Sequence, residues 1–202
     1  MVTRNLNKRQ IDLEIISEWV EPKSRVLDLG CGRGVLLQNL KSEKSIYGVG
    51  VDTDPIKING CIKRGVNAYQ GEIGGILKEF SDKTFDVVIC SRTVQELTNP
   101  ANVIFEALRV GRAVMIGFVN HGYWVNRFNM VFKGNRVIND VYPQHWYESS
   151  PENPVTINEF ELFCKESQIR IQRKVYLSGD WDTKLTFLPN LLSGYALYEI
   201  AR

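Results

Sequence analysis

Residues 26–34 of this chain, VLDLGCGRG, are an apolar run that leads into a glycine-rich loop. The run has the Val and Leu content of a buried strand. A helical pattern, GVLLQNLKS, begins at the last of the glycines. Three glycines within five residues cost backbone order and offer no side chain for packing, so they indicate that another molecule approaches the backbone here. The segment therefore predicts a strand, a ligand-binding loop and a helix in immediate succession.

The same alternation of strand and helix continues along the chain. Short apolar runs at residues 45–52, 66–72, 85–91 and 112–120 predict four more strands. Residues 34–42, 54–65 and 99–110 have helical periodicity or helix caps and predict helices between them. Because successive strand–helix units cross over with one hand, they build one mostly parallel sheet with helices on both faces. The expected fold class is α/β.

The second half of the chain departs from this alternation. Residues 120–155 are rich in aromatic and polar side chains and predict an inserted cap or loop. Residues 156–167 predict a last helix, and the alternating patterns of residues 169–179 and 194–202 predict an antiparallel hairpin at the sheet edge. No linker or repeat interrupts the chain, so we expect one domain over residues 1–202.

Composition excludes several classes of function. The formal net charge is +2 over 202 residues, which favours neither nucleic acid nor a membrane surface as a partner. No apolar run approaches the roughly 20 residues of a membrane span, and no signal sequence is visible. The four cysteines are scattered and there are two histidines, so we expect reduced thiols in a cytoplasmic protein and no metal site.

The spacing of the glycines narrows the ligand. Gly30, Gly32 and Gly34 form G-x-G-x-G, and Val35 stands where a dinucleotide-binding loop has its third glycine. The loop also lacks the Lys-Ser/Thr pair of a phosphate-binding loop, so the pattern favours a ligand without a pyrophosphate. Asp52 follows about 20 residues later at a strand end, where a ribose diol needs an acceptor. The alternative is a tight strand–helix turn with no ligand.

The glycine loop after the first strand, together with the acid at the end of the second, resembles the pattern of class I S-adenosylmethionine-dependent methyltransferases. The resemblance implies their Rossmann-like fold and S-adenosylmethionine as cofactor. The resemblance extends further, to the MetW family of methionine-biosynthesis proteins, and covers nearly the whole chain. It implies a link to the homoserine O-acyltransferase step of methionine synthesis. The segments that carry it are RVLDLGCGRG, YGVGVDTD, RGVNAYQGE, FDVVICSRTVQEL, LRVGRAVMIGFVNHGYW, HWYESSPENPVTINEFELFC and PNLL.

The resemblance assigns roles to nine residues near the strand ends. The glycine loop would line the methionine end of the cofactor, the acid after the second strand would bind the ribose, and residues after the second and third strands would lie beside the adenine. Asp28 would accept a hydrogen bond near the loop or, through a water molecule, from the cofactor amino group; alternatively it would only cap the loop backbone. The candidates are Asp28, Gly30, Cys31, Gly32, Asp52, Thr53, Glu72, Ile73 and Ser91.

The ribose acid has two possible positions. If the segment GVDTDP is aligned with the usual pattern at the end of the second strand, the acid is Asp52. If it is aligned with the MetW pattern, the acid would stand where this chain has Gly50. We favour Asp52, although Asp52 and Asp54 would also be suited to capping the next helix.

The sequence names no catalytic residue. The cofactor already activates the methyl group, so positioning supplies much of the rate and a base is needed only if the acceptor loses a proton. Polar and aromatic side chains of the insert would form an acceptor wall, but a lid, core packing or a protein–protein patch is the favoured alternative. These residues are Asn120, His121, Tyr123, Trp124, His145, Trp146 and Tyr147.

Two functions are consistent with these features. One is a methyltransferase that acts on a small molecule. The other is a non-catalytic or regulatory S-adenosylmethionine-binding companion of homoserine O-acyltransferase. Residues 90–93, CSRT, lack the Asn/Asp-Pro-Pro-Tyr motif of enzymes that methylate base amines, which argues against nucleic acid as the acceptor.

Overall fold

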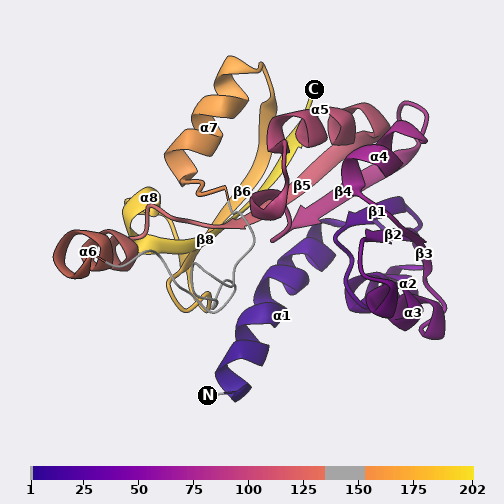
Figure 1. Cartoon of the computed structure of the whole chain (residues 1–202), viewed down its shortest axis with the longest axis horizontal. Helices are drawn as coiled ribbons and strands as arrows, with labels where there is room; N and C mark the ends of the chain where they lie inside the picture. The colour runs from indigo at the N-terminus through magenta and orange to yellow at the C-terminus, as the bar shows by residue number, and fades with distance from the viewer. Residues whose placement is uncertain (1, 135–152) are drawn as a thin grey trace.

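A computed structural model of the chain describes residues 2–134 and 153–202, apart from the side chains of residues 2–9. Within these residues one eight-stranded sheet has the order β3-β2-β1-β4-β5-β8-β6-β7 (Figure 1). Strands β1 to β5 are parallel, and β8, β6 and β7 extend the sheet by antiparallel pairing. The strands are β1 (Arg25–Leu29), β2 (Tyr47–Asp52), β3 (Asn67–Gln70), β4 (Phe85–Ser91), β5 (Gly111–Val119), β6 (Arg170–Ser178), β7 (Lys184–Leu185) and β8 (Ser193–Ala201).

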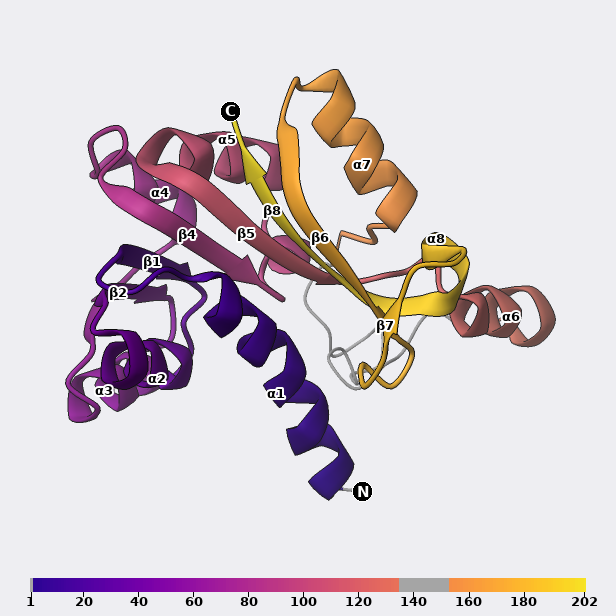
Figure 2. The same ribbon diagram turned by 180° about the vertical axis from the view of Figure 1, so that it is seen from behind.

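Helices cover both faces of the sheet, as Figure 2 shows from behind. One face carries α1 (Val2–Trp19), α2 (Val35–Lys44) and α3 (Pro55–Lys63), and the other carries α4 (Ile73–Lys78), α5 (Pro100–Val110) and α7 (Ile157–Glu166). Each set packs its apolar side chains into a separate buried cluster against the sheet. The predicted α/β, Rossmann-like class of fold is confirmed. The remaining helices are η1 (Val94–Glu96), α6 (Trp124–Lys133) and α8 (Pro189–Leu192).

Local sequence signals explain where the helices near the site begin. The Asp54 carboxylate accepts the N–H of Ile56 at 2.8 Å and caps α3, and the Asn99 side chain accepts the N–H of Asn102 at 3.2 Å and caps α5. Each helix then has proline in its first turn, where the missing N–H costs nothing. These caps fix the ends of the β2–α3 and β4–α5 connections that border the strand ends.

The strand order reverses between β1 and β4, because β1 leads outward to β2 and β4 leads the opposite way to β5. The helices that follow these two strands, α2 and α5, cover opposite faces of the sheet. The two chain paths diverge beyond the carboxyl ends of β1 and β4 and leave a crevice there, which is where open α/β sheets bind ligands.

The C-terminal strands pair antiparallel as predicted, but they reach the sheet edge only through β6 and β7. Strand β8 lies between β5 and β6, and all nine of its residues are buried. Helix α4 was not predicted, because Gly74 and Gly75 disfavour a helix, yet it forms and buries Ile73 and Leu77. Of the predicted insert at residues 120–155, residues 135–152 lie outside the described part of the chain.

Candidate functional site

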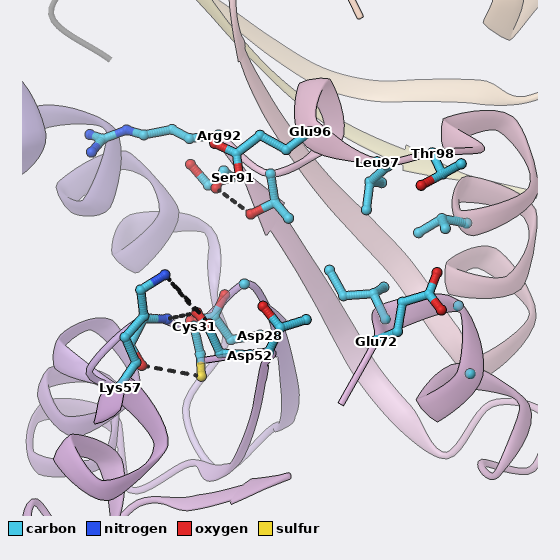
Figure 3. Close-up of a pocket in the computed structure, with 18 of the residues that line it drawn as sticks. Asp28, Cys31, Asp52, Lys57, Glu72, Ser91, Arg92, Glu96, Leu97 and Thr98 are labelled. Carbon is cyan, nitrogen blue, oxygen red and sulfur yellow. Dashed lines mark hydrogen bonds and ion pairs between the residues drawn. The ribbon is translucent and has the colours of Figure 1, made fainter. Parts of the chain in front are cut away.

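A cleft of about 870 Å³ opens at the strand-order reversal, beyond the carboxyl ends of β1, β2 and β4 (Figure 3). The nine candidate residues from the sequence analysis come from several loops, and the fold brings all of them to this one cleft. They are Asp28, Gly30, Cys31, Gly32, Asp52, Thr53, Glu72, Ile73 and Ser91.

The glycine loop after β1 forms the floor of the cleft. Gly30, Gly32 and Gly34 have φ angles of +78°, +57° and +74°, a region that other residues enter only with strain. The N–H groups of Gly30 and Cys31 both donate to the carbonyl of Val51, at 2.8 and 3.0 Å, which fastens the loop to the end of β2. A Cβ added at Gly32 would meet no heavy atom within 4 Å, so the backbone there is open to a ligand.

Asp52, the last residue of β2, is 5% exposed and holds the loop from the side. One carboxylate oxygen accepts the N–H of Gly32 and the other accepts the N–H of Asp54, both at 3.0 Å. The ammonium of Lys57 lies 3.4 Å from each oxygen. Since the Lys57 side chain is half-exposed, its contact is the one that a ligand hydroxyl would replace at least cost.

The structure bears on the alternative position of the ribose acid. Gly50 is a buried residue inside β2, and a Cβ there would lie 2.5 Å from the sulfur of Cys31. The space beside Gly50 is therefore filled by Cys31. Asp54 has the predicted capping role, whereas Asp52 faces the cleft as well as the start of α3.

Asp28 lies beneath the loop, 6% exposed, and within the described residues its carboxylate has no hydrogen-bond partner. The loop N–H groups donate instead to Val51 and Asp52, so Asp28 does not cap the loop backbone. Burial, helped by the charge of Asp52, raises the pKa of Asp28 to about 7. A ligand that brings a positive charge or an N–H donor would relieve this unpaired carboxylate.

This pKa predicts a pH-dependent stability for the ligand-free protein. Because the folded value of about 7 exceeds the ordinary 3.8, the folded chain holds this proton more tightly, and the resulting stabilisation is lost as the pH rises toward 7. We expect the free energy of unfolding of wild type to fall relative to Asp28→Asn by roughly 2–3 kcal/mol between pH 5 and pH 7. Denaturant unfolding of both proteins across this range measures it.

A control for this measurement is Asp86→Asn. Hydrogen bonds from the Arg25 backbone and side chain lower the pKa of Asp86, so its stabilising contribution is lost only at acid pH, below the ordinary value of 3.8. The difference between wild type and this variant should therefore be flat from pH 5 to pH 7. Parallel pH profiles for wild type and Asp28→Asn would show that Asp28 is ionised throughout.

The other candidates line the cleft walls. Thr53 and Glu72 are exposed, Glu72 directly precedes α4, and Ile73 buries its side chain in the first turn of that helix. Figure 3 shows Glu72 on the opposite side of the cleft from Lys57. The hydroxyl of Ser91, at the end of β4, is 2.9 Å from that of Tyr195.

Several cleft residues were missed by the sequence analysis, among them Lys57, Arg92, Thr93 and Glu96. Burial raises the pKa of Glu96, which is partly offset by the charge of Lys57. Lys57 follows the end of β2 by five residues, and Glu96 follows the end of β4 by five residues. Their short distance along the chain from Asp52 and Ser91 is the sequence signal that would have identified them.

The described part of the predicted acceptor wall does not line this cleft. Asn120 is fully buried and bonded on every side: its amide N–H₂ donates to the carbonyls of Asn190 and Ser193, and its oxygen accepts the N–H groups of Gly122 and Ile157. The acceptor-wall role is wrong for Asn120 and the core-packing alternative holds, because these bonds join the end of β5 to α7 and β8. His121, Tyr123 and Trp124 also lie away from the cleft, whereas His145, Trp146 and Tyr147 lie outside the described residues.

Residues 2–134 and 153–202 contain no group of three or more His, Cys, Asp or Glu side chains placed to hold a metal ion. Over the same residues, no helix has both the length and the apolar character that crossing a membrane requires.

The fold is that of S-adenosylmethionine-dependent methyltransferases. Such an enzyme from Archaeoglobus fulgidus matches 98% of this chain and 94% of its own length, with a TM-score of 0.67 and 16% identity. A magnesium protoporphyrin IX methyltransferase from Synechocystis, solved with bound SAH, matches 99% of this chain and 86% of its own length, with a TM-score of 0.70 and 12% identity.

The chain belongs to the MetW family, described as methionine biosynthesis protein MetW, whose pattern matches residues 10–200. A bifunctional methionine biosynthesis protein MetXA/MetW from Rhodopirellula baltica is 33% identical over 132 residues, which are 61% of this chain and 21% of that protein. A ubiquinone biosynthesis O-methyltransferase from Hahella chejuensis is 29% identical over 96 residues, 45% of this chain and 40% of that enzyme. The chain thus spans less than half the length of either relative.

Proposed function

We propose that the cleft binds S-adenosylmethionine and that the protein transfers its methyl group to a small molecule in methionine biosynthesis. The observation that carries the proposal is the convergence of the nine candidate residues on one cleft at the strand-order reversal. The family supports the link to methionine biosynthesis, and the fold supports the cofactor.

Each residue has a role that its surroundings suit. Gly30, Cys31 and Gly32 would receive the methionine end on the open backbone, and the unpaired Asp28 carboxylate would accept the amino group. Asp52 would exchange the Lys57 ammonium for the ribose hydroxyls. The adenine would lie between the β2–α3 and β3–α4 connections, beside Thr53, Glu72 and Ile73, while Ser91 closes the floor at β4.

The bound cofactor would supply an activated methyl group, so the protein has to orient an acceptor and exclude water. Glu96 is the side chain best suited to take a proton from an acceptor, because it lines the cleft and burial raises its pKa. We place the protein in the cytoplasm, where its four free cysteines would stay reduced.

Calorimetric titration of S-adenosylmethionine and S-adenosylhomocysteine into the full chain tests the cofactor. Saturable one-to-one binding of both is expected, with NADH as a control that should not bind. Binding of NADH without either methionine derivative would overturn the proposal.

A second candidate is a regulatory companion that binds the cofactor without turnover. The MetXA/MetW relative favours it, since one chain there carries both parts, and the MetW family resemblance points to homoserine O-acyltransferase as the partner. Co-purification of the two proteins, together with a cofactor-dependent change in acyltransferase rate, would support this role. Methyl transfer from labelled cofactor into a small-molecule fraction, with no effect on the acyltransferase, would support the enzyme instead.

A further inference from the structure

Two cysteine sulfurs meet directly under the glycine loop. Cys31 belongs to the loop and Cys61 belongs to α3, thirty residues later, and their Sγ atoms are 3.8 Å apart. Cys31 is 8% exposed and lines the cleft, whereas Cys61 is fully buried. A disulfide has an S–S length of about 2.0 Å, so the sulfurs would need to approach by about 1.8 Å to bond.

Both sulfurs touch the backbone that faces the ligand site. The carbonyl of Gly32 lies 3.3 Å from the sulfur of Cys61 and 3.7 Å from that of Cys31. A Cβ at Gly34, which precedes α2, would lie 2.9 Å from the Cys61 sulfur. Because the Gly32 carbonyl contacts both sulfurs and the Cys61 sulfur occupies the space beside Gly34, we expect a bond between the sulfurs to shift the backbone of the loop.

We propose that Cys31 and Cys61 form a reversible disulfide on exposure to hydrogen peroxide, and that this bond displaces the glycine loop and weakens cofactor binding. The effect on cofactor binding rests on the proposed function, whereas the formation of the disulfide does not. The Cys31 thiolate attacks one peroxide oxygen, and the O–O bond breaks to leave a sulfenic acid and water. The Cys61 thiol then attacks that sulfur and releases a second water, so two S–H bonds are lost, one S–S bond forms and the peroxide takes up two electrons.

Accessibility gives the pair an order of reaction. Cys31 is the sulfur at the cleft, so peroxide reaches it first, and Cys61 is placed to resolve the sulfenic acid before further oxidation. Burial, together with the charge of Asp28, raises the pKa of the Cys31 thiol, which slows the first step and protects the resting protein. A ligand on the loop would shield Cys31, so binding and oxidation should oppose one another.

The test is treatment of the full chain with hydrogen peroxide, followed by intact mass, peptide mapping and titration of S-adenosylhomocysteine. The expected product has lost two hydrogens, links Cys31 to Cys61, binds S-adenosylhomocysteine at least about tenfold more weakly and recovers on reduction with dithiothreitol. Cys31→Ser and Cys61→Ser should each abolish the link. Cys164→Ser, which removes a buried thiol on α7, should leave it intact.

The outcomes separate this inference from the proposed function. Peroxide that adds oxygen to Cys31 without linking it to Cys61, or no reaction at all, overturns the inference whether or not the ligand binds. If the Cys31–Cys61 disulfide forms but the reduced protein does not bind S-adenosylhomocysteine, the oxidation site is supported and the proposed function is overturned. If the disulfide forms but the affinity for S-adenosylhomocysteine is unchanged, the proposed effect of the disulfide on the glycine loop and on binding is overturned.

Discussion

Replacing Asp52 with alanine should weaken the binding of S-adenosylhomocysteine by about 10- to 150-fold. Hydrogen bonds to a charged group contribute about 1.5–3 kcal/mol, which corresponds to that range of affinity. Asp52 is buried at the end of β2, and it also holds the N–H of Gly32 at 3.0 Å. The variant would therefore lose both the acceptor for the ribose and a support of the loop. Calorimetric titration measures the loss.

Two further variants separate these effects. Asp52→Asn keeps an oxygen that can accept the Gly32 N–H but loses the charge, so its affinity should lie between those of wild type and Asp52→Ala. Asp86→Asn removes an acid from the opposite, amino-terminal end of the same sheet, where Asp86 contacts Arg25, and it should bind like wild type. Wild-type affinity in Asp52→Ala would remove this residue from the site.

The parallel half of the fold could be predicted because its signals are local. Strand β4 coincides with the predicted run at residues 85–91, and α3 and α5 begin at the predicted caps. The candidate site followed from the same information, since in a parallel sheet the strand ends meet at one edge. Asp28, Asp52 and Ser91 could thus be grouped without knowing any contact between them.

What could not be predicted depends on contacts between distant segments. The position of β8 inside the sheet follows from pairing with β5 and β6, and no local pattern specifies a neighbour. Helix α4 forms against its own glycines because Ile73 and Leu77 gain more from burial than Gly74 and Gly75 cost. Asn120 resembled a site residue, but its three hydrogen bonds to Asn190, Ser193 and Ile157 make it structural.

A buried ion pair beside the cleft was also invisible in the sequence, because its members are separated by 80 residues. The carboxylate of Asp12, on α1, is fully buried and accepts a hydrogen bond of 2.5 Å from Arg92, which follows β4. The other carboxylate oxygen accepts from Tyr195 at 3.2 Å and from Ser91 at 3.3 Å. Gly117 leaves room for the Tyr195 hydroxyl, since a Cβ there would lie 2.0 Å from it. These contacts fasten α1 to the sheet at the wall of the cleft.

Replacing Asp12 with alanine should therefore lower the free energy of unfolding by about 3–5 kcal/mol, the cost of breaking a buried ion pair. For a chain of this length that corresponds to a fall in Tm of about 6–20 °C. The Arg92 side chain is 18% exposed, so its charge would be left partly desolvated and without its carboxylate. Denaturant unfolding and a thermal scan measure the change.

The double variant Asp12→Ala/Arg92→Met distinguishes the ion pair from simple loss of packing. The double variant removes both members of the Asp12–Arg92 pair, so the Arg92 charge no longer faces a site that has lost its carboxylate, and this variant should be more stable than Asp12→Ala alone. Asp86→Ala provides the exposed counterpart, since the Arg25 and Asp86 side chains are 47% and 35% exposed, and it should cost less than about 1 kcal/mol. If Asp12→Ala cost no more than Asp86→Ala, α1 would be held by its apolar face and not by Asp12. The Leu13 side of the cleft would then depend on packing alone.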